Sequence, residues 1–114
     1  MLPDGVEMPE TADALWAQIE ITRKALGDAL AASKKEDVAK QAAILGPLAY
    51  GLREKYPALT AERKHSVHHE TKAVTHLSSD LSEAAGQGDF EKAKLILNQI
   101  DGALKFVKET VTKK

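Results

Sequence analysis

Apolar side chains recur every three or four residues along most of the chain, and no segment alternates strictly between apolar and polar positions. The first spacing gathers apolar residues on one face of an α-helix, whereas a half-buried strand requires strict alternation. Four segments of this kind are separated by polar, proline-containing or glycine-containing turns. The pattern therefore predicts four helices and no sheet, with helices over about 11–32, 34–55, 60–85 and 89–111.

Residues that favour helix ends stand at the predicted boundaries. Thr11 and Thr60 are suited to accept a hydrogen bond from the first helical turn, as N-cap residues do. Ser33 and Glu36 match the S-x-x-E capping box and predict that the second helix starts directly after the first. The stretch Gly-Gln-Gly-Asp at 86–89 combines a glycine stop with an N-cap for the last helix. We therefore expect short connections throughout.

A chain of 114 residues is long enough to bury one core, and we expect a single domain over 1–114. Short connections between long helices force helices that are neighbours in sequence to run in opposite directions. The expected fold is all-α, an antiparallel up-down-up-down four-helix bundle.

Two features interrupt the regular pattern. Gly46-Pro47 lies inside the second predicted helix, where proline removes a backbone hydrogen bond and is expected to bend the helix. A tolerated bend in a curved bundle explains the pair, and a pocket opened together with Gly51 is the alternative. Trp16, the only tryptophan, is predicted to pack in the core or to cap one end of it.

Composition and charge exclude several classes of partner and of site. The net charge is −1, with basic and acidic residues mixed along the chain, so no basic surface is expected to follow a nucleic acid. No apolar run approaches the roughly 20 residues that span a bilayer, so we expect no membrane insertion. The absence of cysteine excludes disulfides, thiolate metal sites and c-type haem attachment. The first five residues fit either a cytoplasmic start or a mature chain after removal of a signal peptide, and we favour the periplasm.

All four histidines fall between residues 65 and 76, in the stretch HSVHHETKAVTH. His65 and His69 are four residues apart, which places their Cβ atoms about 5–6 Å apart on one helix face, so two imidazoles can share one ion. Glu62 precedes His65 by three residues and completes a two-histidine, one-carboxylate set suited to Zn, Cu or Ni. His76 lies about 10.5 Å further along the helix axis and His68 points about 100° away, so both are auxiliary.

The helical register turns the histidines away from the core. The apolar residues that define the inner face of the third helix are Val67, Val74, Leu77 and Leu81. His65, His69 and His76 lie on the opposite side, which excludes an interior di-metal centre of the ferritin-like type. Neither a serine or cysteine nucleophile pattern nor an inward carboxylate pair is present, and we expect no enzymatic activity.

Three interpretations of the histidine face remain open. They are a solvated polar surface, a transition-metal site of modest affinity, and a contact surface that responds to pH. Neighbouring cations, among them Arg63, Lys64 and Lys72, oppose both metal binding and histidine protonation.

The layout resembles the soluble periplasmic b-type cytochromes that form four-helix bundles, in its length, its short hairpin turns and the passage from Leu81 to Ala93. That family holds haem between a methionine near the start of the first helix and a histidine late in the last one. Met8 roughly matches the first position, but Lys108 occupies the second. The resemblance therefore implies the fold and no haem.

The pair Leu15-Trp16 and the spacing from Ala84 to Asp89 are similar to those of small periplasmic helical proteins that handle heavy metals. Together with the histidine face, this resemblance makes binding or buffering of a transition metal the leading functional hypothesis. The alternative is a non-catalytic protein-interaction or sensor-input module without metal, with a protein partner or a second copy of the chain bound to the bundle surface.

Overall fold

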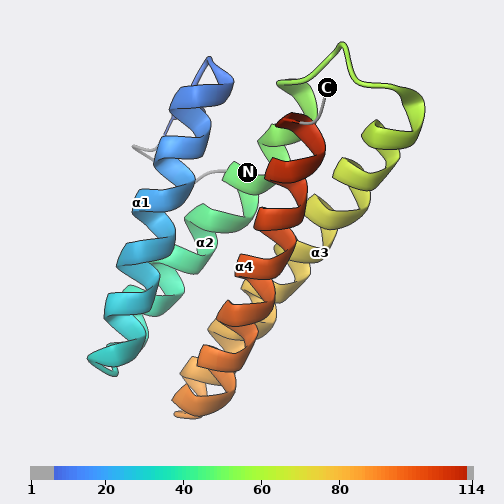
Figure 1. Cartoon of the computed structure of the whole chain (residues 1–114). Coiled ribbons are helices and arrows are strands. Elements are labelled where there is room, and N and C mark those ends of the chain that lie inside the picture. Colours follow the sequence, from blue (N-terminus) through green and yellow to red (C-terminus); the bar gives the residue numbers. More distant parts are fainter. Residues whose placement is uncertain (1–6, 113–114) are drawn as a thin grey trace.

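The computed structural model describes residues 7–112, so the first residues of the chain, on which the choice of compartment depended, lie outside it. Its elements are α1 (Ala12–Ala31), α2 (Lys35–Gly51), the short 3-10 turn η1 (Leu52–Glu54), α3 (Ala61–Gly86) and α4 (Phe90–Thr112). There is no strand in the described range, and the four helices pack against one another around a common core (Figure 1). The predictions of an all-α fold and of four helices are confirmed.

The helices meet in pairs at the two ends of the molecule. In Figure 1, α1 and α2 are joined at the lower end, α2 and α3 at the upper end, and α3 and α4 at the lower end. The two lower turns are neighbours in space, since the Lys35 amine lies 3.8 Å from the position that a Cβ would take at Gly88. The connections are residues 32–34, 55–60 and 87–89.

Three of the four predicted N-caps are confirmed. Thr11, Thr60 and Asp89 each accept a hydrogen bond from the backbone N–H three residues later, at 3.1–3.3 Å. These side chains satisfy N–H groups that have no partner inside the helix. They therefore hold the starts of α1, α3 and α4 close to the predicted positions.

The predicted capping box at the start of α2 is wrong. Ser33 has φ 55°, and the N-cap of α2 is Lys34, which makes no side-chain capping bond. The Ser33 N–H donates to the Leu30 carbonyl and the Lys34 N–H donates to the Ala29 carbonyl, which is a Schellman ending for α1. Ser33 ends α1 in a left-handed conformation, so it cannot also adopt the extended backbone that an N-cap requires. Gly88, at φ 82°, ends α3 in the same way.

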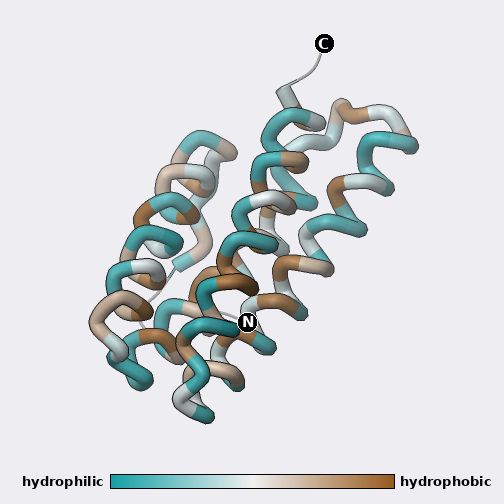
Figure 2. The backbone as a smooth tube through the Cα atoms, turned by 60° about the horizontal axis from the view of Figure 1, so that its bottom comes forward, coloured by the Kyte–Doolittle hydropathy of each residue, from teal (hydrophilic) through white to brown (hydrophobic). Residues whose placement is uncertain are grey.

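Each helix buries one face and exposes the other, and hydrophobic and hydrophilic segments alternate along every helix (Figure 2). The largest fully buried side chains are Leu15, Ile19, Leu26, Leu30, Leu45, Leu48, Leu52, Leu81 and Ile100. α3 packs extensively against α2 and α4, α1 packs mainly against α2, and α1 touches α4 much less than it touches α2. Within residues 7–112, no helix is long and apolar enough to cross a membrane.

α2 continues through Gly46 and Pro47. Gly46 is buried, and a Cβ there would lie 3.7 Å from the Ser78 Cβ, so α2 and α3 run close together at this point. Two surface hollows of about 470 and 540 Å³ meet at Pro47 and Thr75, and the second one reaches Gly51. The pocket named as the alternative at the Gly-Pro pair is therefore present, in the form of open hollows on the surface.

Candidate functional site

The histidines belong to a regular and well-anchored helix. The Thr60 hydroxyl caps the first turn of α3, and the helix is unbroken from Ala61 to Gly86. Farther along, the buried Thr71 hydroxyl donates to the Val67 carbonyl at 2.7 Å, a bond within the helix that leaves the histidine face untouched. The spacing between the histidines is therefore that of an ordinary α-helix.

All four histidines are exposed. Three buried positions of α3, Val67, Thr71 and Val74, lie between them in sequence, and the other buried positions, Ser78, Leu81, Ala84 and Ala85, follow. The predicted outward orientation of His65, His69 and His76 is therefore confirmed. His65 and His69 keep the i,i+4 relation that places their Cβ atoms about 5–6 Å apart.

The third predicted ligand, Glu62, is also exposed, one turn before His65. Among residues 7–112, no three histidine or carboxylate side chains lie together in an arrangement able to hold a metal ion. The helix backbone thus supplies the spacing for two ligands, and a third requires side-chain rotation, water or another chain.

The surroundings of His68 differ from those of the other histidines. Its backbone carbonyl accepts a hydrogen bond from Nη2 of Arg53 at 2.8 Å, and Nε of the same guanidinium donates to Thr71 at 2.8 Å. The guanidinium carbon also lies 4.0 Å from the centroid of the Tyr50 ring. Arg53 therefore fastens η1 to α3 and brings a fixed positive charge to this side of the histidine stretch, which disfavours a cation at His68. Sequence analysis missed this contact, because nothing local marks Arg53 as the partner of α3.

A second group of side chains gathers where α1 faces α4, and we call it the α1–α4 seam. Its members are Trp16, Ile19, Glu20, Arg23, Lys24, Asp101, Leu104, Lys105 and Lys108. Arg23 donates two hydrogen bonds to the Asp101 carboxylate, the Nε–Oδ1 distance being 2.8 Å. Lys108 lies 3.7 Å from a Glu20 carboxylate oxygen and 5.7 Å from the centroid of the Trp16 ring. These contacts connect two helices whose backbones otherwise approach each other at few points.

The ion pair raises the pKa of Arg23. The hydrogen bonds that Arg23 donates to the Asp101 carboxylate raise the pKa of Arg23 above its ordinary value, and partial burial opposes this effect without cancelling it. Arg23 therefore remains a cation throughout the neutral and mildly alkaline range.

Trp16 is half-buried against the core, and its Nε1 donates to the Tyr56 hydroxyl at 2.6 Å. It thus packs at the edge of the core near one end of the bundle, in line with the predicted role. The two positions that resemble haem-ligand positions have different neighbours: Met8 contacts Gly51 at the end of α2, whereas Lys108 approaches Trp16.

Both candidate regions rest on the geometry of this chain alone, since no protein-family model, curated protein or solved structure matches it.

Proposed function

We propose that the outer face of α3 binds a transition-metal ion, Zn(II), Cu(II) or Ni(II), through His65 and His69. The observation that carries the proposal is the exposure of both imidazoles at i,i+4 positions on an unbroken helix. This is the spacing with which two histidines of one helix reach the same ion. Glu62 is the proposed third ligand, and His68 and His76 are auxiliary.

The charges around the pair determine how tightly it binds. Arg63, Lys64 and Lys72 lie on the same helix, and the positive end of the helix dipole is close to His65. Both effects oppose a bound cation, so we propose a site of modest affinity that exchanges its metal. Such a site suits buffering or transfer of metal better than structural support of the fold.

A calorimetric titration with Cu(II) at neutral pH tests this function. We expect one site in the unaltered protein and at least about tenfold weaker binding after His65→Ala/His69→Ala. His76→Ala should weaken binding by no more than about twofold, because this auxiliary residue is too far along the helix to share the same ion. Zn(II) and Ni(II) should bind more weakly than Cu(II), because affinities at nitrogen ligands follow that order. Acidification should weaken binding of every metal, because protons compete for imidazole. Binding that survives the double substitution would refute the proposal.

The arrangement of the helices is part of the proposal. We infer an antiparallel up-down-up-down bundle, supported by the short connections and by the proximity of Lys35 and Gly88 at one end. Export to the periplasm is likewise proposed, in keeping with a chain that has no cysteine, and fractionation of cells that express the full gene tests it.

A second candidate function has its own observation. Leu95 and Phe106 of α4 are 65% and 47% exposed, and their spacing of eleven residues, close to three helical turns, puts them on the same side of the helix. This pair supports a protein-interaction module in which a protein partner or a second copy covers α4. Sedimentation velocity compares the protein with Leu95→Ser/Phe106→Ser, and a concentration-dependent dimer lost in that variant is the expected result. A monomer at all concentrations would exclude the homodimer.

A further inference from the structure

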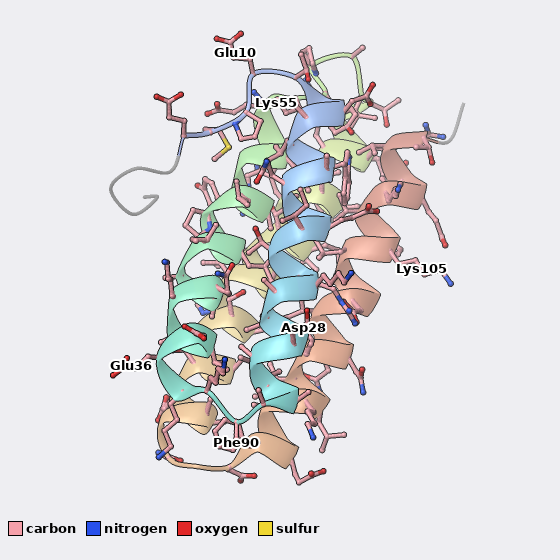
Figure 3. All side chains as sticks on the ribbon, turned by 90° about the vertical axis from the view of Figure 1, so that its left-hand side faces the viewer. Glu10, Asp28, Glu36, Lys55, Phe90 and Lys105 are labelled. Carbon is pink, nitrogen blue, oxygen red and sulfur yellow. The ribbon has the colours of Figure 1, made fainter. Side chains whose placement is uncertain are left out.

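A cleft of about 570 Å³ lies along the α1–α4 seam and is open to solvent. The two helices come close at one point of the seam, where a Cβ on Gly27 would lie 3.8 Å from the Leu97 side chain. The Arg23–Asp101 pair lies next along the seam, and the cleft extends from there toward Trp16 and Lys108. Figure 3 views the molecule from the α1 side, with α4 beside α1 and side chains of both helices along the boundary.

The floor of the cleft is apolar. Ile19 from α1 and Leu104 from α4 form it, and the half-buried ring of Trp16 extends it toward the end of the bundle. The hydrogen bond from Trp16 to Tyr56 and the approach of Lys108 restrict the ring, so it offers a prepared apolar surface. Aromatic surface of this kind is typical of sites for small molecules.

The rim of the cleft is positively charged. It carries four basic and two acidic side chains, a local charge of +2 in a chain whose net charge is −1. Both acidic groups already have a cation, Arg23 in one case and Lys108 in the other. Lys24 and Lys105 have no ion pair with any residue that the structure describes, and Figure 3 shows Lys105 extending from α4 into solvent. The two lysines stand on opposite walls of the cleft.

We infer that the α1–α4 seam binds a small carboxylate with an apolar body, such as a medium-chain fatty acid. The apolar body would cover Ile19, Leu104 and Trp16, and the carboxylate would lie between Lys24 and Lys105. An apolar floor and a surplus of cations at the rim complement this class of molecule better than a cationic or a neutral one. The site is independent of the histidines on α3.

The single tryptophan lines the cleft, so its fluorescence reports on occupancy. The experiment titrates the full chain with monomeric dodecanoate at neutral pH and follows Trp16 emission. We expect a saturable shift in emission, and about tenfold weaker binding in Lys24→Gln/Lys105→Gln, because two unpaired cations are lost. Neither lysine is the cation that approaches Trp16, so the emission of the free variant remains comparable.

Lys34→Gln/Lys40→Gln on the α2 side is the matched control and should bind as the unaltered protein does. Dodecanol and dodecyltrimethylammonium at the same concentration should leave the emission unchanged. Absence of saturation with dodecanoate, equal binding of the cationic analogue, or equal affinity in the Lys24→Gln/Lys105→Gln variant would each overturn the inference. A response to phosphatidylglycerol vesicles without a response to monomeric dodecanoate would also overturn the inference, since it would indicate binding to a membrane surface.

Discussion

The outer face of α3 and the α1–α4 seam each have one property of a binding site and lack another. The α3 face has potential ligand side chains without a cleft, and the seam has a cleft without histidines. The α3 face has chemically distinctive side chains, the four histidines, on a convex helix surface where all of them are exposed. The seam has a cleft, a half-buried tryptophan and ion pairs, and its charged side chains are of the types found on any protein surface. Metal coordination requires only a few ligand atoms at a set spacing, whereas an organic molecule requires apolar surface removed from water.

The two kinds of site depend on structure over different distances along the chain. The histidine pair needs one intact helix and would survive a change in the packing of the bundle. The seam exists only because α1 and α4 lie side by side while touching little. Changes in packing should therefore affect the seam strongly and the histidine face weakly.

The largest effect is expected at the floor of the cleft. Leu104 is 8% exposed and packs in the common core, so Leu104→Ala should cost about 2–4 kcal/mol of unfolding free energy through lost burial and a residual cavity. Urea denaturation measures the change. A cost below about 1 kcal/mol would show that the seam is not continuous with the core.

A stabilising change of smaller size is expected beside the seam. Gly102 is exposed inside α4, and a Cβ there would meet no atom within 4 Å. Gly102→Ala should therefore raise the unfolding free energy by about 0.5–1 kcal/mol through reduced backbone entropy of the unfolded chain. Thermal denaturation measures it, and loss of stability instead would reveal a contact of Gly102 that this structure lacks. Metal and dodecanoate binding should both stay unchanged.

The ion pair across the seam should contribute less than its geometry suggests. The side chains of Arg23 and Asp101 are 41% and 35% exposed, so solvent screens their attraction. A double-mutant cycle with Arg23→Ala and Asp101→Ala should give a coupling of about 0.5–1 kcal/mol. No measurable coupling would mean that packing alone holds α1 to α4.

The pH dependence of this coupling follows from the direction of the pKa shift. Because the pKa of Arg23 is raised in the folded protein, the contribution of its charge is present below the pKa of the unfolded state and is lost only as the pH rises through the raised value. The coupling should therefore be equal at about pH 6 and about pH 9. A decline across this interval would mean that a group other than Arg23 supplies the positive charge of the pair.

The smallest effect on stability is expected on the α3 face. Both histidines of the pair are exposed, so His65→Ala/His69→Ala should change the unfolding free energy of the metal-free protein by less than about 0.5 kcal/mol. Chemical denaturation with a chelator present measures it. A loss of more than about 1 kcal/mol would mean that the histidines support the fold, and reduced metal binding in this variant would then need another explanation.

Local features could be predicted from the sequence. Helix periodicity located all four helices, three N-caps depended on side chains within one turn of the helix, and the register of α3 placed the histidines outside. Ser33 shows the limit of such rules, because one residue matched the signal for a helix start while the chain used it for a helix end. Two local preferences competed, and only the backbone conformation decided between them.

The seam could not be predicted, because its partners are far apart in sequence. Arg23 and Asp101 are separated by 78 positions, and each is an ordinary charged residue on an amphipathic helix. Their pairing depends on which helices become neighbours and at what height along the bundle. Trp16 carried the only sequence signal for the seam, as a single large aromatic residue near the start of the first helix.

The most direct test of metal binding on α3 follows the ring signals of the four histidines by NMR during titration with Zn(II). We expect the signals of His65 and His69 to change together and to saturate at one equivalent, while those of His76 and the indole signal of Trp16 change much less. Equal, unsaturated changes at all four histidines would contradict it, because they would show a solvated polar face without a site.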